Sequence, residues 1–119
     1  MQNLKLKDRA YKYSIDIIGF IDNLAKDSSA QVITNQLSRS ATSIGANIIE
    51  AQASSSKRDF TNFLNHSLKS ANESLYWLGL LKDAKKLSGP HIDYLLKETQ
   101  ELANILGSSI ITLKGRNKF

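Results

Sequence analysis

The sequence predicts an all-α protein, an up-down-up-down antiparallel four-helix bundle in which residues 1–119 form a single domain. Apolar residues recur at spacings of three and four along four segments, which is typical of amphipathic helices. No segment alternates apolar and polar residues as a strand would, and the chain contains one proline. A few residues join each segment to the next, so neighbouring helices should be antiparallel.

The first helix is expected over about residues 5–25. Its apolar face consists of Leu6, Ala10, Tyr13, Ile17, Phe20, Ile21 and Leu24, widened by Tyr11, Ile15 and Ile18. Polar residues at positions 26–29 interrupt this pattern. Ser28 followed by Gln31 fits a capping box, so a second helix is expected over about residues 31–53.

The second helix carries an apolar stripe formed by Ile33, Leu37, Ala41, Ile44, Ile48 and Ala51. Serines at positions 54–56 form the next turn. Ser56 followed by Asp59 repeats the capping pattern, and Asp59 is also favourable at the positive end of a helix dipole. These residues predict a third helix over about residues 57–87.

The third helix should pack through a seam of Phe60, Leu64, Ser67, Ala71, Leu75, Leu78 and Leu81, flanked by Phe63, Leu68 and Trp77. Ser88, Gly89 and Pro90 end it, because proline fits the first turn of a helix and not its interior. A fourth helix is expected over about residues 90–113. Its stripe is Ile92, Leu95, Leu96, Thr99, Leu102, Ala103, Leu106, Ile110 and Leu113.

The net charge of +5 is concentrated near the two termini. In the predicted topology, the start of the first helix, the turn after the second and the end of the fourth lie at one end. Cations gathered there would suit phosphate binding. The candidate nucleic-acid-binding residues are Lys5, Lys7, Arg9, Lys12, Lys57, Arg58, Lys114, Arg116 and Lys118. The alternative is that lysine-rich termini only aid solubility.

A polar row, Arg39, Ser43, Asn47 and Glu50, lies beside the apolar stripe of the second helix. Polar groups bordering a core are costly to bury unless they bond to one another or to a facing helix. A hairpin about Ser55 brings Arg39 level with residues 71–73, so Arg39 and Glu73 are candidates for an interhelical ion pair. We expect the polar row and Glu73 to fix helix register or a subunit contact.

Several kinds of site lack the residues that they need. There is no cysteine, which excludes disulfides and thiolate metal sites. Neither histidine has a carboxylate at ligand spacing, no glycine-rich phosphate loop is present, and the serines have no histidine base nearby. We therefore expect no catalytic residue, metal or cofactor. No secretory signal or segment of ~20 apolar residues is readable, so we expect a cytoplasmic protein without a membrane partner.

Tyr76 and Trp77 are adjacent on the third helix and cannot both face one core. Because aromatic residues are enriched at protein contacts, one of them is a candidate interface residue. The alternative is that Trp77 covers the edge of the core while Tyr76 is exposed to water.

The segment QLSRSATSIGANIIEA, followed by SKRDFTNFLNHSLKSANESLYWLGLL, resembles the signature of the bacterial 23S rRNA intervening-sequence proteins, which are four-helix bundles. The resemblance runs over about residues 36–87. It combines the polar row with Lys57, Asp59, Phe60, Phe63, Leu64 and Glu73. Ala51 and Gly45 depart from the family, which often has glycine and proline at these positions.

The resemblance implies a ring-like homo-oligomer, often a pentamer. It also implies a relation to the accessory proteins of diversity-generating retroelements, basic bundles that bind nucleic acid together with a reverse transcriptase. The role of most members is undetermined. We therefore expect a non-enzymatic homo-oligomer that binds RNA or DNA through a basic end. The alternative is a scaffold that docks a partner protein without touching nucleic acid.

Overall fold

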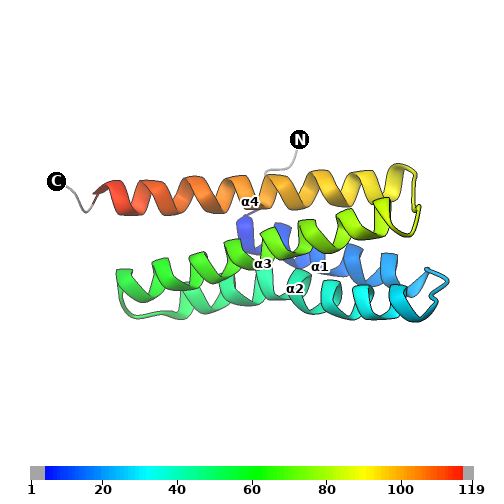
Figure 1. Cartoon of the computed structure of the whole chain (residues 1–119). Coiled ribbons are helices and arrows are strands. Elements are labelled where there is room, and N and C mark those ends of the chain that lie inside the picture. The colour runs from blue at the N-terminus through cyan, green and yellow to red at the C-terminus, as the bar shows by residue number, and fades with distance from the viewer. Residues whose placement is uncertain (1–4, 117–119) are drawn as a thin grey trace.

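A computed structural model describes residues 5–116. This part of the chain forms four helices, α1 (Leu6–Asp22), α2 (Ser28–Ala53), α3 (Lys57–Asp83) and α4 (Pro90–Arg116), and contains no strand. Each helix runs opposite to the one before it (Figure 1). The predicted all-α four-helix bundle is therefore confirmed.

The core is a single apolar cluster to which all four helices contribute. Fully buried side chains include Ile17 of α1, Leu37 of α2, Leu78 of α3 and Leu106 of α4. Burying each such side chain contributes about 1.5–3 kcal/mol relative to leaving it exposed. Among the helix pairs that are in contact, α2 with α3 has the most extensive contact and α1 with α4 the least extensive.

The start of α2 differs from the prediction, and the start of α3 agrees with it. Asp27, not Ser28, caps α2, because its carboxylate accepts the backbone N–H of Ala30 at 3.0 Å. Hydrogen bonds from Lys85 and then from Ala30 lower the pKa of Asp27 to about 2. At α3, the Ser56 hydroxyl accepts the backbone N–H of Asp59 at 3.1 Å, which confirms the predicted cap.

Three helix ends were misplaced by the sequence pattern. α1 ends at Asp22 and α3 at Asp83, not near residues 25 and 87, whereas α4 continues beyond residue 113 to Arg116. Lys86 explains the end of α3. Its φ of 59° lies in the left-handed region. A right-handed helix cannot continue through a residue in this conformation, so α3 ends before Lys86.

The first helix buries a narrower face than expected. Tyr11, Ile15 and Ile18 are 70%, 54% and 45% exposed, so the prediction that they widen the core face is wrong. Their spacings of four and three place them on a second, outward stripe of α1. Tyr11 shares a surface groove with Ile49 of α2, which is also exposed. We call Tyr11, Ile15, Ile18 and Ile49 the outer apolar face.

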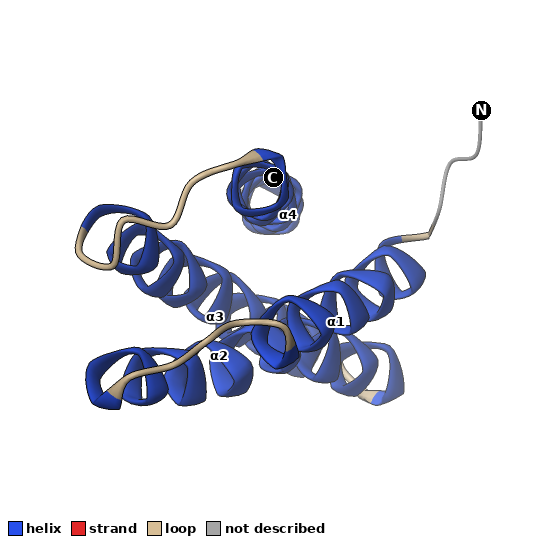
Figure 2. Cartoon of the chain, turned by 90° about the vertical axis from the view of Figure 1, so that its right-hand side faces the viewer, coloured by secondary structure: helices blue, strands red, loops and turns tan. Residues whose placement is uncertain are grey.

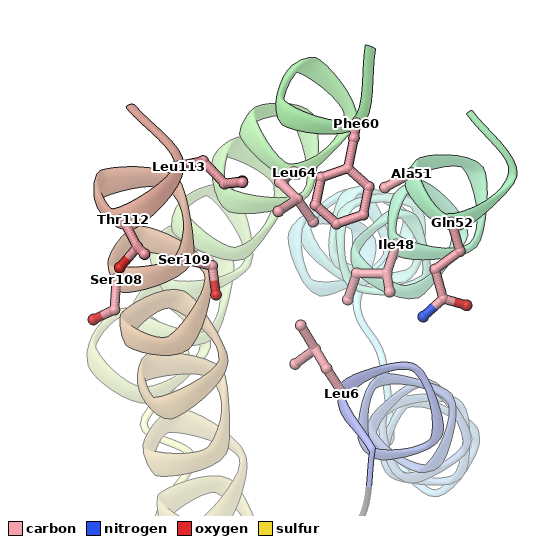
Figure 3. A pocket seen from close by; sticks show the side chains of 10 residues that line it. All are labelled: Leu6, Ile48, Ala51, Gln52, Phe60, Leu64, Ser108, Ser109, Thr112 and Leu113. Carbon is pink, nitrogen blue, oxygen red and sulfur yellow. The ribbon is translucent and has the colours of Figure 1, made fainter. Parts of the chain in front are cut away.

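The bundle is open at one end because α1 is short and inclined. In Figure 2 α4 is seen along its axis while the other helices cross the view obliquely, and in Figure 1 α1 begins beside the middle of α4. The turn after α2 and the last turns of α4 extend past this point and form what we call the hinge end. There a pocket of about 410 Å³ opens between the helices, with Leu6, Phe60 and Leu64 pointing toward it (Figure 3).

Candidate nucleic-acid interface

A basic groove at the hinge end collects three of the predicted nucleic-acid-binding residues. It measures about 370 Å³ and is lined by Lys57, Arg58, Thr61, Asn62 and Lys114. All three cations are exposed. They come together because α3 begins directly after the hinge serines and the end of α4 lies alongside. Cations with uncharged hydrogen-bonding neighbours are what a phosphate backbone requires.

The remaining terminal cations lie apart from this groove or outside the described residues. Lys5 precedes α1 and is exposed, while Lys7 lines the groove between α1 and α2. Arg116 is the last residue of α4, and its side chain is outside the described part of the structure. Lys118 lies outside the part of the chain that the structure describes.

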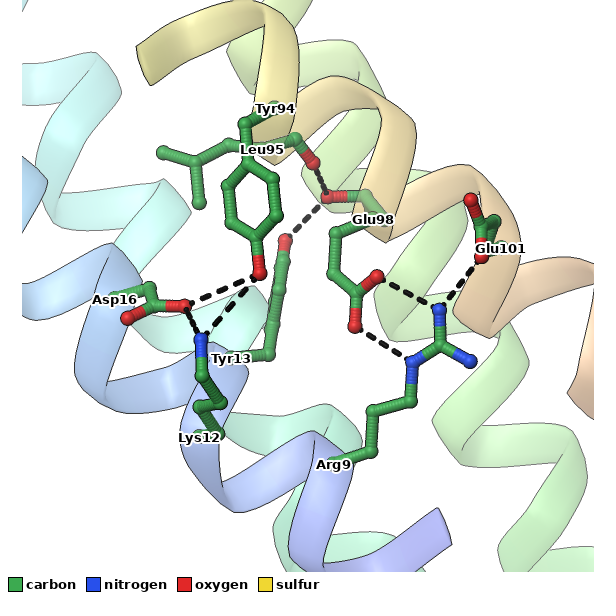
Figure 4. Close-up of polar contacts among 9 residues, drawn as sticks. Arg9, Lys12, Tyr13, Asp16, Tyr94, Leu95, Glu98 and Glu101 are labelled. Carbon is green, nitrogen blue, oxygen red and sulfur yellow. Dashed lines mark hydrogen bonds and ion pairs between the residues drawn. The ribbon is translucent and has the colours of Figure 1, made fainter. Parts of the chain in front are cut away.

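Arg9 is held by two carboxylates of α4 (Figure 4). Its guanidinium donates to both carboxylate oxygens of Glu98, from Nε and Nη2, each at 2.7 Å. Nη2 also donates to Glu101 at 2.7 Å. These hydrogen bonds, that to Glu98 first, raise the pKa of Arg9. Its positive charge is therefore already compensated within the bundle.

Lys12 is also paired within the bundle. Its ammonium donates to Asp16 at 2.9 Å and lies 5.7 Å from the centre of the Tyr94 ring. Tyr94 and Glu98 belong to the first half of α4, far along the helix from Lys114. The expectation that nine cations meet at one end is therefore wrong for Arg9 and Lys12.

The polar row does not form the predicted interhelical network. Arg39 is exposed and forms no ion pair within residues 5–116, whereas Glu73 accepts the indole N–H of Trp77 at 3.0 Å. Ser43 donates to the carbonyl of Arg39 at 2.7 Å, and Asn47 to that of Ser43 at 2.9 Å, so both bond along their own helix. The predicted Arg39–Glu73 ion pair is therefore wrong.

Sequence reasoning missed the polar layer that does cross the core. The Ser40 and Ser74 hydroxyls lie 2.8 Å apart, and those of Tyr13 and Thr99 lie 2.6 Å apart. One residue of this layer comes from each helix, and all four are buried. Burial raises the pKa of Tyr13 to about 12, although hydrogen bonds with Thr99 and Ser74 act in the opposite direction.

The adjacent aromatic residues divide between surface and core edge. Tyr76 is 61% exposed, whereas Trp77 is partly buried against the core cluster. Their rings meet edge to face with centroids 5.0 Å apart. Tyr76 is therefore the member of the pair that a partner could reach.

Other kinds of site find no support in the described residues. Within residues 5–116, no three His, Asp or Glu side chains are grouped so as to hold a metal ion. None of the four helices is long and apolar enough to cross a bilayer, as far as the chain is described.

The protein family described as 23S rRNA-intervening sequence protein matches residues 2–108. The chain belongs to this family. A solved structure from Bacteroides thetaiotaomicron, described as a protein of unknown function from the S23 ribosomal protein family, has 35% sequence identity and a TM-score of 0.82. The similarity covers 89% of this chain and 98% of that one. No curated protein matches the chain.

Membership in the 23S rRNA-intervening sequence protein family confirms the resemblance read from the polar row and the start of the third helix. The similar structure has the same fold over nearly its whole length. Because that structure is of a protein of unknown function, the similarity assigns no role to this chain.

Proposed function

We propose that this member of the family is a non-enzymatic, homo-oligomeric protein of the cytoplasm that binds RNA or another nucleic acid. The observation that carries the proposal is the basic groove, where Lys57, Arg58 and Lys114 line one surface and no aspartate or glutamate is among the lining residues that the structure describes. Assembly would repeat this groove around an oligomer, which raises avidity without new contacts.

Reversing two charges in the groove tests the nucleic-acid part of the proposal. The double variant Lys57→Glu, Arg58→Glu should bind a short structured RNA at least tenfold more weakly at low salt. Losing two phosphate contacts should also reduce the slope of log affinity against log salt by about 1.5. Fluorescence anisotropy at several salt concentrations measures both quantities.

A matched control separates the groove from net charge. The control is the double variant Lys69→Glu, Lys97→Glu, which changes the net charge by the same amount as the groove variant. Its two sites are exposed positions of α3 and α4 outside the groove. It should retain most of the affinity. If both double variants lose affinity to the same extent, the groove is not the binding site.

The outer apolar face supports self-association. Tyr11, Ile15, Ile18 and Ile49 are each at least 45% exposed and lie on adjoining helices. A contiguous apolar surface on a folded domain commonly marks a protein contact. The pentamer that the family resemblance implies would bury this face on each of its subunits and bring the basic grooves into one assembly.

Ile15→Glu should convert the oligomer into monomers, because a charge would have to be buried at each contact. Size-exclusion chromatography with light scattering measures the change. The control is Ile111→Glu, which introduces the same charge at a 72% exposed position of α4 and should leave the assembly intact. A wild-type protein that is already monomeric would contradict the proposed oligomer.

A partner-protein scaffold is the second candidate, and the exposed Tyr76 ring favours it. The same chromatography with and without RNA distinguishes the two functions. An oligomer that takes up RNA only at low salt supports nucleic-acid binding. An oligomer indifferent to RNA at every salt concentration supports a scaffold.

A further inference from the structure

The basic groove contains hydrogen-bond acceptors as well as cations. Arg58 and Lys114 supply positive charge and form no ion pair among the described residues. Beside them, Thr61 and Asn62 line the same groove with a hydroxyl and an amide. A phosphodiester oxygen accepts hydrogen bonds and has no hydrogen to donate, so it can bind the cations but cannot satisfy an acceptor. The lining of the groove therefore offers more than phosphate groups alone can use.

The Thr61 hydroxyl is restricted to the role of an acceptor. It donates its one hydrogen to the carbonyl of Lys57, four residues earlier, at 2.8 Å, and its lone pairs remain for an incoming donor. The Asn62 amide is exposed and forms no hydrogen bond within residues 5–116, so its oxygen is a second acceptor. A ligand that fits this groove carries hydrogen-bond donors close to its phosphates.

Nucleotide bases find no stacking partner in the groove. None of its described lining residues is aromatic. The nearest rings along α3 are engaged elsewhere: Phe60 points toward the pocket at the hinge end (Figure 3), and Phe63 and His66 pack edge to face with centroids 6.3 Å apart. Proteins that bind single strands gain much of their affinity from bases stacked on aromatic side chains. A duplex keeps its bases stacked on one another and releases more counterions per phosphate contact, so it suits the groove better.

We propose that the groove binds double-stranded RNA and recognises the ribose 2′-hydroxyl beside the phosphates. This inference rests on the proposed function and adds to it the form of nucleic acid that is bound. Arg58 and Lys114 contact phosphates, while a 2′-hydroxyl donates to the Thr61 oxygen. The wide, shallow minor groove of A-form RNA displays 2′-hydroxyls within reach of side chains that also contact the backbone. A DNA duplex of the same sequence lacks this donor.

Fluorescence anisotropy with two duplexes of one sequence tests the proposal. One is an RNA duplex of about 16 base pairs. The other carries 2′-fluoro groups, which keep the A form but have no hydrogen to donate. The wild type should bind the RNA duplex about fivefold more tightly, as expected for one neutral hydrogen bond.

Thr61→Val keeps the shape of the side chain and removes the acceptor. The variant should bind both duplexes as the wild type binds the 2′-fluoro duplex. Because no phosphate contact is lost, the slope of log affinity against log salt should stay unchanged. Asn62→Ala, at an exposed position, is a second groove variant and should also reduce the preference for the RNA duplex.

The matched control is Thr42→Val, on α2 and outside the groove. The Thr42 hydroxyl also donates to the carbonyl four residues earlier at 2.8 Å, so the control removes the same kind of bond within a helix. It should keep the fivefold preference. An equal loss of preference in Thr61→Val and Thr42→Val would overturn the proposal, since the preference would not then come from the groove.

The remaining outcomes separate this inference from the proposed function. A wild type that binds neither duplex at low salt would contradict nucleic-acid binding itself. If the wild type binds both duplexes equally, nucleic-acid binding stands and recognition of the 2′-hydroxyl is overturned. Tighter binding of a single RNA strand than of the duplex would show that bases are contacted, which also overturns the inference.

Discussion

Replacing Arg9 by methionine should destabilise the fold by about 2–3 kcal/mol. Arg9 joins α1 to α4 through three hydrogen bonds to Glu98 and Glu101. The Glu98 side chain is 13% exposed, so its charge depends on the guanidinium for stabilisation. Without Arg9, this carboxylate remains partly buried beside a second one three residues away, and breaking a buried pair from one side costs about 3–5 kcal/mol. The expected loss is smaller because Arg9 and Glu101 are partly exposed.

A double-mutant cycle separates the pair from the packing of the Arg9 side chain. Arg9→Met, Glu98→Gln, and the double variant are compared by urea unfolding. Glutamine has no charge that would be left unpaired without Arg9. The double variant should therefore lose about 1–2 kcal/mol less free energy of unfolding than the sum of the losses of the two single variants. Strict additivity would mean that the pair makes no net contribution. Arg9→Met should leave RNA binding unchanged, since its charge is already compensated.

The sequence predicted the architecture because helical periodicity and turn residues agreed. The serine turn with Ser56 and Asp59 located the α2–α3 hairpin, and counting twelve residues from Ser55 in each direction places Ser43 level with Ser67. In the structure Ser67 donates to the carbonyl of Ile44, one residue from the predicted level, at 2.8 Å. In a helical hairpin, residues at equal distances from the turn face each other. These distances can be counted in the sequence once the turn is located.

Rotation of each helix about its axis was harder to predict. Arg39 lies near the expected level on α2, opposite residues 71–73, but its side chain faces solvent. Its distance from the turn therefore did not determine which residue it contacts. On α3, the predicted core seam contained Leu75 and not Ser74. Ser74 is the buried residue, and its spacing of three from Ala71 and four from Leu78 was the available signal. A hydroxyl at a core position is tolerated because Ser40 and the carbonyl of Ser70 satisfy it.

The placement of Arg9 and Lys12 failed for a different reason. Assigning them to the hinge end assumed that the first helix starts level with the end of the fourth. α1 spans 17 residues, whereas α4 spans 27, and α1 begins beside the middle of α4. The pair Glu98 and Glu101, three residues apart on one face of α4, was the sequence signal for a cation nearby. Helix inclination follows from packing between helices, which a pattern read one helix at a time does not contain.

Raising the pH from 9 to 12 should cost the fold about 2–3 kcal/mol through Tyr13. Its pKa is raised by burial to about 12, from an ordinary value of 10.0. In the unfolded chain the phenol ionises near pH 10, whereas in the bundle it keeps its proton until about pH 12. Stability from this group is therefore complete below pH 10 and is lost between pH 10 and 12, at about 1.4 kcal/mol per unit of pKa.

Comparison with Tyr13→Phe isolates this effect, because phenylalanine fills the same space and does not titrate. At pH 7 the variant should be about 1 kcal/mol less stable, having lost the hydrogen bond between Tyr13 and Thr99. Urea unfolding followed by circular dichroism from pH 7 to 12 should then show a smaller decline than in the wild type. Lys12 contributes a decline of the same sign to both proteins, because its hydrogen bond to Asp16 raises the pKa of the ammonium. Parallel curves for the two proteins would show that Tyr13 ionises normally, and that water reaches the polar layer between the four helices.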